Sequence, residues 1–122
     1  MRLLIIDDEK QICEEFRETL EQEGYQVDTA SDGKKGLDMV RSKKYDVVFL
    51  DAAMPSWDGQ EVLKRIRRFS AVPVALISGF LTNTREQEIM ELGAFACLRK
   101  PLELNEVKAL LRGVEHFHAS AR

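Results

Sequence analysis

The sequence lacks a long apolar run, and it has only 2 cysteines. No stretch approaches the roughly 18 consecutive apolar residues that a membrane-spanning helix needs, and the apolar start of the chain soon runs into Asp7 and Asp8. We therefore expect no membrane association and a cytoplasmic protein. Cys13 and Cys97 lie in unlike local patterns, with no second pair that could form a disulfide framework or a metal cage. Both are predicted to be reduced packing residues.

The sequence also lacks an excess of positive charge. Its 18 Lys and Arg residues are outnumbered by 21 Asp and Glu residues, which gives a formal net charge of -3. Nucleic-acid binding normally needs a dense positive field, so direct contact with nucleic acid is not expected. What is present is 44% hydrophobic and 32% charged residues. This composition, with a length of 122 residues, predicts one folded domain with its own core.

Short apolar runs alternate with amphipathic segments along the whole chain. Asp46 to Leu50 is the clearest strand, because its apolar residues are consecutive, as in a strand covered on both faces. Further strands are predicted at residues 3–6, 26–30, 74–77 and 94–98, and an amphipathic helix follows each of the five. The alternation predicts a doubly wound α/β domain with a five-stranded parallel sheet and five helices.

Polar residues mark the expected helix ends. Ser31-Asp32, Asp58 and Thr82-Asn83 each precede an amphipathic segment and can cap its first turn. Gly24 and Gly93 follow the last apolar residues of two segments, where a helix commonly ends in a left-handed residue.

Chemically useful side chains collect where the predicted strands end. Asp7 and Asp8 follow the first strand, Asp51 the third, Ser78 the fourth and Lys100 the fifth. In open α/β sheets the functional crevice lies beyond the carboxyl ends of the strands. Taken singly each residue is unremarkable, since an acidic pair is usually a solvated turn. Their joint placement predicts one site.

Three carboxylates in that crevice would repel one another unless a cation offset their charge. An all-oxygen site from Asp7, Asp8 and Asp51 suits Mg²⁺, which keeps part of its hydration shell. A carboxylate can also act as a nucleophile toward phosphorus when fixed donors meet the incoming charge. Lys100 and Ser78 are the candidates for that task, with backbone amides after Asp51.

These residues resemble the motifs of response regulator receiver domains, the family that includes the chemotaxis response regulator. The resemblance covers nearly the whole chain, with residues 1–118 as the receiver domain and 119–122 as a tail or the start of a linker. It implies the flavodoxin-like strand order 2-1-3-4-5. The motifs are Leu4 to Glu9, Leu50 to Gly59, Ile77 to Gly79, Gly93-Ala94 and Lys100 to Leu102.

The resemblance implies a role for each residue of the site. Asp51 is the expected phosphoacceptor, and Asp8 and Asp51 bind Mg²⁺ directly, with Asp7 acting through water and the backbone carbonyl of Ala53 as a further ligand. Ser78 is the expected switch hydroxyl. Lys100 is its ionic partner, and the Lys100-Pro101 bond is expected to be cis.

The resemblance also implies partners. The phosphoryl donor is a histidine kinase or a phosphotransfer protein, and the output is an unidentified effector or a fused output domain. Dimerisation through the last helices after phosphorylation occurs in relatives, and nothing in the sequence fixes the oligomeric state. The chain is expected to catalyse only its own phosphorylation and slow dephosphorylation, and not to be an enzyme acting on other substrates.

Two positions depart from the family pattern. Cys97 stands where receivers commonly carry an aromatic residue that rotates inward on activation, so coupling from Ser78 must take another form, for which Phe80 is one candidate. Ala53 and Phe80 occupy places near the phosphoryl group where many relatives can hold an attacking water. We therefore predict a long-lived acyl phosphate.

Two other functions compete with the relay. A Mg²⁺-dependent phosphohydrolase could use Asp51 as nucleophile, but such enzymes carry a second acid two residues later, where this chain has Ala53. A degenerate receiver could serve as an interaction module that is independent of phosphorylation. Cys97 favours this second alternative, and the intact acidic residues with Ser78 and Lys100 oppose it.

Overall fold

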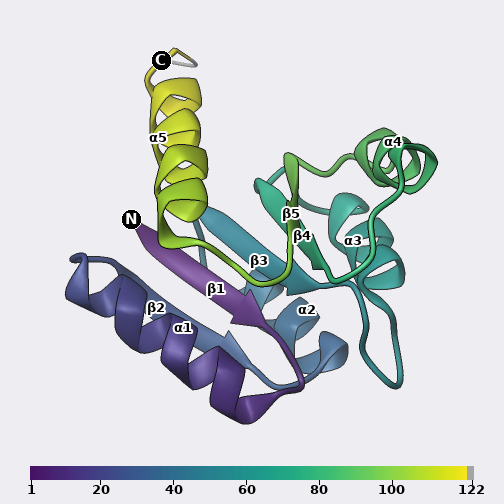
Figure 1. The fold of residues 1–122 in the computed structure, drawn as a ribbon, viewed down its shortest axis with the longest axis horizontal. Coiled ribbons are helices and arrows are strands. Elements are labelled where there is room, and N and C mark those ends of the chain that lie inside the picture. The colour runs from purple at the N-terminus through teal and green to yellow at the C-terminus, as the bar shows by residue number, and fades with distance from the viewer. Residues whose placement is uncertain (121–122) are drawn as a thin grey trace.

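A computed structural model describes residues 1–120, with side chains described through Phe117. It shows one parallel sheet in the order β2-β1-β3-β4-β5, with helices between successive strands, as predicted (Figure 1). The strands are β1 (Arg2–Ile6), β2 (Gln26–Ala30), β3 (Val47–Asp51), β4 (Val74–Ser78) and β5 (Ala96–Arg99). The helices are α1 (Lys10–Gln22), α2 (Gly33–Ser42), α3 (Gly59–Arg67), α4 (Asn83–Glu91) and α5 (Leu104–Ser120).

The helices form two layers, one on each face of the sheet. Leu4 and Leu50 belong to the core that joins the sheet to α2, α3 and α4, whereas Leu3 and Phe49 belong to the core under α1 and α5. Successive side chains of a strand point to opposite faces. A strand that is apolar at consecutive positions therefore serves both cores, which is why β3 is buried along its whole length.

The polar residues at the helix ends act as predicted. Asp32, Asp58 and Thr82 each accept a hydrogen bond from the backbone N–H three residues later, at 2.8, 2.9 and 3.1 Å. Gly24 and Gly93 have φ angles of 95° and 100°, a left-handed backbone that residues with a Cβ rarely adopt. These residues fix where the helices begin and end.

The fifth strand starts later than predicted. It runs over Ala96–Arg99 rather than residues 94–98, because the backbone N–H of Ala94 donates to the Ile89 carbonyl and completes the turn that ends α4. The strand ends at Arg99. The peptide bond between Lys100 and Pro101, which follows the strand, is cis, as expected.

The last helix, α5, reaches into the segment predicted as a tail. It runs to Ser120, and residues 121–122 of the predicted tail 119–122 lie outside the described residues. Over the described part of the chain, no helix is long and apolar enough to cross a membrane.

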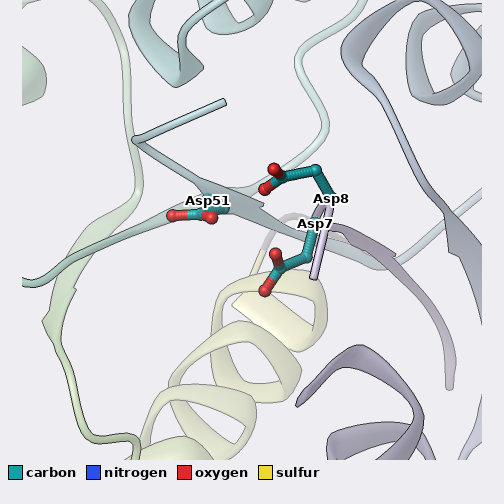
Figure 2. Close-up of side chains that lie close together, drawn as sticks. All are labelled: Asp7, Asp8 and Asp51. Atoms are coloured by element: carbon teal, nitrogen blue, oxygen red, sulfur yellow. The ribbon is translucent and has the colours of Figure 1, made fainter. Parts of the chain in front are cut away.

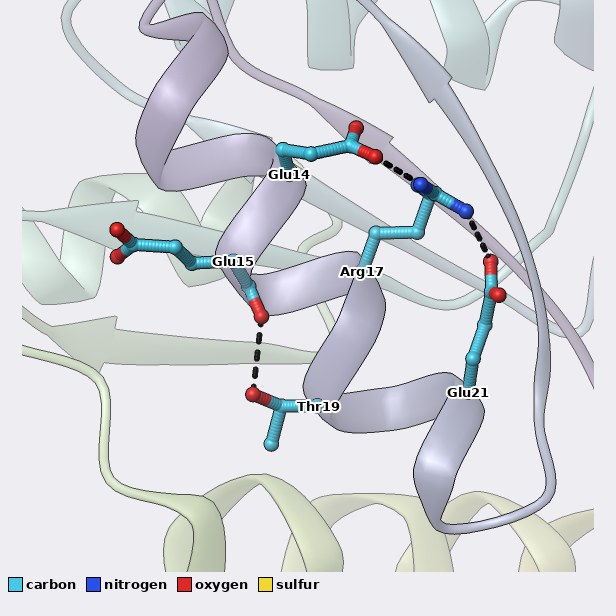
Figure 3. Close-up of polar contacts among 5 residues, drawn as sticks. All are labelled: Glu14, Glu15, Arg17, Thr19 and Glu21. Carbon is cyan, nitrogen blue, oxygen red and sulfur yellow. Dashed lines mark hydrogen bonds and ion pairs between the residues drawn. The ribbon is translucent and has the colours of Figure 1, made fainter.

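Helix α1 carries ion pairs on its outer face (Figure 3). Arg17 pairs with Glu14 and, at 2.6 Å, with Glu21, and the hydroxyl of Thr19 donates to the backbone carbonyl of Glu15. Pairs this exposed contribute little to stability. The helix is held instead by its buried face, where Cys13 and Leu20 are almost inaccessible, the Phe16 ring contacts Phe49 edge-on, and the Cys13 thiol is free.

Candidate functional site

The sheet brings the predicted site residues to one edge. β1 and β3 are neighbours, with Ile6 opposite Leu50, so the residues that follow them emerge side by side. Ser78 and Arg99 are opposite each other at the ends of β4 and β5. This edge is where the strand order reverses between β1 and β3, the usual place for a site in such sheets.

Three carboxylates converge there from two strand ends (Figure 2). One carboxylate oxygen each from Asp7, Asp8 and Asp51 lies within 4.8 Å of the others. Asp51 is only 2% exposed and Asp7 only 8%, whereas Asp8 is open to solvent. The cluster is therefore partly removed from water. Like charges repel one another more strongly in such a buried site than in water.

The two oxygens of the Asp51 carboxylate have unlike surroundings. Oδ1 accepts a hydrogen bond from the Lys100 ammonium at 3.1 Å and another from the Ala53 backbone N–H at 3.2 Å. Oδ2 is buried and has no hydrogen-bond partner among the described residues. A buried carboxylate oxygen without a partner is costly, so this atom is a prominent point for an added cation or phosphoryl group.

Burial and charge change the proton affinities of the neighbouring groups. Burial, together with the charge of Asp51, raises the pKa of Asp7 from 3.8 to about 6, although the Glu9 backbone N–H, which donates to Asp7 at 2.9 Å, opposes the shift. Burial lowers the pKa of Lys100, but the hydrogen bond and charge of Asp51 outweigh it and raise this pKa. The site thus holds more negative charge than Lys100 alone can offset.

These residues fit a magnesium ion. The clustered donors are all carboxylate oxygens, which Mg²⁺ prefers, and the exposed position of Asp8 leaves room for coordinated water. Ala53 lies beside the cluster through its own hydrogen bond to Asp51. The clustered negative charge and the Asp51 Oδ2 atom without a partner would both be stabilised by a bound cation.

The hydroxyl of Ser78 is engaged with its own loop. Its Oγ donates to the Phe80 carbonyl at 3.0 Å and accepts from the Phe80 backbone N–H at 3.1 Å. Ser78 is 7% exposed and belongs to the same edge as Asp51, whose strand pairs with β4. The predicted switch residue is therefore at the site, with its hydroxyl bonded to the loop that follows β4.

Sequence reasoning missed two residues that shape the site. Gly59, the first residue of α3, lies so close to β3 that an added Cβ would be 2.6 Å from the Asp51 carbonyl oxygen. Arg99, the last residue of β5, donates from Nη1 to the Leu81 carbonyl at 3.0 Å. Gly59 ends the motif Leu50 to Gly59, but the motif gave it no role, and Arg99 had no signal because an arginine before a lysine is common.

Comparison with known proteins gives a consistent answer. Residues 3–112 match the response regulator receiver domain family. The chain is 36% identical over 113 residues to the transcriptional regulatory protein DltR of Streptococcus agalactiae, covering 92% of this chain and 50% of that protein. It is 37% identical over 119 residues to the CpxR homolog of Haemophilus influenzae, covering 98% and 52%. The chain spans about half the length of these curated relatives.

Solved structures agree with the sequence comparisons. A receiver domain from Clostridium thermocellum superposes with a TM-score of 0.92 at 27% identity, covering 99% of this chain and 98% of that one. The response regulator TrrA of Thermotoga maritima, described in complex with Mg²⁺ and BeF, has a TM-score of 0.82 at 31% identity, covering 93% and 97%. The chain therefore belongs to the response regulator receiver domain family of two-component signalling.

Proposed function

We propose that this receiver domain accepts a phosphoryl group on Asp51, in a reaction that depends on Mg²⁺, and thereby changes a surface that other proteins recognise. The observation that carries the proposal is the buried Oδ2 of Asp51, which has no hydrogen-bond partner among the described residues. Lys100 holds the other oxygen of the same carboxylate, so Oδ2 is the oxygen left to take a new ligand.

The proposed magnesium ligands are the carboxylates of Asp8 and Asp51 and the backbone carbonyl of Ala53, with Asp7 acting through water. Bound Mg²⁺ would supply positive charge that the incoming phosphoryl oxygens need. The complex of the related Thermotoga maritima protein with Mg²⁺ and BeF supports this assignment.

The residues of the chain account for the transfer step. The Asp51 carboxylate attacks phosphorus, an O–P bond forms, and the N–P bond of a phosphohistidine breaks, leaving an imidazole that takes up a proton from solvent. The Lys100 ammonium, already 3.1 Å from Asp51, neutralises charge on the phosphoryl group, and Ser78 donates to one of its oxygens. Backbone amides after Asp51 add further donors.

The donor in this proposal is a histidine kinase or a phosphotransfer protein in the cytoplasm. The output is an effector or an output domain, an idea supported by relatives that are about twice as long and are named transcriptional regulatory proteins. Ala53 stands where a hydrolase would carry its second acid, which opposes turnover of other substrates. Dephosphorylation is accordingly slow.

The test uses acetyl phosphate, Mg²⁺ and intact-mass measurement. The wild-type protein should gain one phosphoryl group, and Asp51→Asn should gain none. Omission of Mg²⁺ should prevent the gain. No mass change in the wild type would overturn the proposal in favour of an interaction module, and rapid turnover of phosphoesters without a stable adduct would overturn it in favour of a hydrolase.

A further inference from the structure

The connection between β4 and α4, residues 79–82, is short and is fixed at both ends. At its start, two hydrogen bonds hold the Phe80 backbone against Ser78 Oγ. At its far end, Thr82 caps α4. The position of this loop therefore depends on what the Ser78 hydroxyl is bonded to.

Packing of Phe80 does not hold the loop in place. Its side chain is 76% exposed, so it contributes little buried surface. Leu81 is the buried residue of the loop, 8% exposed within the core under α2, α3 and α4. The Leu81 carbonyl accepts the 3.0 Å hydrogen bond from the Arg99 guanidinium. Arg99 thus attaches the middle of the loop to the end of β5.

Arg99 is connected to Ser78 through the pairing of β4 and β5. The two residues are register partners on adjacent strands, and the backbone N–H of Lys100 donates to the Ser78 carbonyl at 2.9 Å. The side chains of Ser78 and Arg99 bond successive residues of one loop, Phe80 and Leu81. A movement of the loop at Phe80 must therefore stretch or break the bond at Leu81.

We propose that Arg99 is a positioning residue, which holds the β4–α4 loop in the arrangement that keeps the Ser78 hydroxyl on Phe80 and so opposes the movement of Ser78 toward a phosphoryl group. The inference rests on the proposed function, because it assumes that Ser78 donates to phosphate on Asp51. To make that bond, the hydroxyl hydrogen leaves the Phe80 carbonyl, and the loop then keeps the buried Leu81 side chain, the Arg99–Leu81 hydrogen bond and the Thr82 cap. Arg99 carries the change to β5.

This arrangement gives a physical alternative to the aromatic rotor that the chain lacks. Cys97, on the same strand, is half-buried and packs against the core as a small side chain. It has no ring that could exchange between an inward and an outward position. The guanidinium of Arg99 instead connects the loop beside the site to the end of β5 through a part-buried hydrogen bond.

The first experiment measures binding of beryllium fluoride with Mg²⁺ as the phosphoryl mimic. Arg99→Met keeps the apolar stem and removes the donors, so we expect about fivefold tighter binding, or about 1 kcal/mol at 1.4 kcal/mol per factor of ten. Binding of Mg²⁺ alone should not change. Arg112→Met, at an exposed position of α5 with no polar partner among the described residues, is the matched control and should bind as wild type does. In the Ser78→Ala background the effect of Arg99→Met should disappear.

The second experiment needs neither metal nor phosphate. Hydrogen exchange of the Phe80 amide in the metal-free protein should be severalfold faster in Arg99→Met than in wild type or Arg112→Met, because the loop opens more easily. Failure of the wild type to bind the mimic would overturn the proposed function and leave this measurement intact. Unchanged exchange, unchanged affinity for the mimic, or an equal effect in the Ser78→Ala background would each overturn the role of Arg99.

Discussion

At the scale of single residues, the two oxygens of the Asp51 carboxylate differ in their hydrogen-bond partners. The Oδ1 atom of Asp51 has two donors, whereas Oδ2 is buried without one among the described residues. The bond from Lys100 therefore does more than neutralise charge. It also restrains the rotation of the carboxylate and leaves Oδ2 as the oxygen without a donor.

The raised pKa of Asp7 predicts a pH dependence. Because this pKa is about 6 in the folded protein and 3.8 ordinarily, the fold favours the protonated carboxyl. The stability that Asp7 contributes without metal is therefore complete below about pH 4 and is lost as the pH rises through 6. Mg²⁺ favours the ionised form, so it should raise the melting temperature more at pH 7.5 than at pH 5.5.

Asp7→Asn provides the matching variant for thermal unfolding. It should melt a few degrees higher than the wild type at pH 7.5 without metal, because one buried negative charge is gone. Its response to Mg²⁺ should be smaller. A lower melting temperature than wild type, or an equal effect of Mg²⁺ at both pH values in the wild type, would contradict the assignment of charge repulsion at this carboxyl.

The side chains at positions 53 and 80 predict the lifetime of the acyl phosphate. Ala53 and Phe80 are both exposed at the site, and neither has a polar side-chain group that could hold an attacking water. We expect the phosphorylated domain to persist well beyond seconds in Mg²⁺. Ala53→Asn should shorten the lifetime by about tenfold, less than the full effect of a positioned general base.

Loss of phosphate can be followed by intact mass after removal of the donor. Ala71→Asn, an exposed substitution in the loop before β4, is the control and should leave the lifetime unchanged. Decay of the wild type within seconds would show that water reaches the phosphoryl group without help from either position.

At the scale of elements, the loop from β3 to α3 is anchored by Trp57. The Arg65 guanidinium stacks on the Trp57 ring at 4.0 Å, and a Cβ at Gly33 of α2 would be 3.5 Å from the same side chain. Arg65 also pairs with Glu61 at 2.9 Å. Arg65 is thus used within the domain, and its neighbour Ile66 is fully buried.

The start of α3 packs directly on the strand that carries Asp51. The Gly59 backbone N–H donates to the Ala52 carbonyl at 3.0 Å, and a Cβ here would lie 2.6 Å from the Asp51 carbonyl oxygen and 2.7 Å from the Ala52 Cα. Gly59→Ala should cost about 1–3 kcal/mol of unfolding free energy through overpacking. It should also weaken Mg²⁺ binding, because the backbone that must move leads to Asp51.

Denaturant unfolding and Mg²⁺ titration would check this prediction. Gly113→Ala is the matched control, since nothing lies within 4 Å of a Cβ at that position of α5. It should stabilise the protein by about 0.5–1 kcal/mol through helix propensity, with no change in metal affinity. Equal effects of the two substitutions would contradict a tight contact at Gly59.

At the scale of the whole molecule, the sheet is shared by both cores, so the domain should unfold in one step. Trp57, the single tryptophan, reports on the layer of α2 and α3, whereas far-UV circular dichroism reports on all helices. Both signals should give the same denaturant midpoint. Separate midpoints would show that the layer of α1 and α5 unfolds independently.

Much of this architecture could be predicted from the sequence because its signals are local. Consecutive apolar residues identified β3, the caps Asp32, Asp58 and Thr82 marked helix starts, and the strand order placed Asp7, Asp8 and Asp51 at one edge. The start of β5 was predicted wrongly, because Ala94 is apolar whether it closes a turn or begins a strand.

The finer features of the site depend on contacts between residues far apart in the sequence. The bond from Arg99 to Leu81 spans 18 positions, and which Asp51 oxygen accepts from Lys100 depends on the side-chain rotation. The closeness of Gly59 to β3 depends on how α3 packs. Composition and periodicity carry no information on such contacts, so these features could be found only in three dimensions.

Because β3 is buried on both faces, few substitutions in it should be tolerated. Phe49 and Leu50 face opposite layers, so a change in either layer acts on the same backbone that ends in Asp51. Random mutagenesis with selection for signalling should therefore recover few replacements in the middle of the sheet. The edge strand β2, where only Ala30 is buried, should collect many. We therefore expect tolerated substitutions to gather at the edge of the sheet and to be rare at its centre.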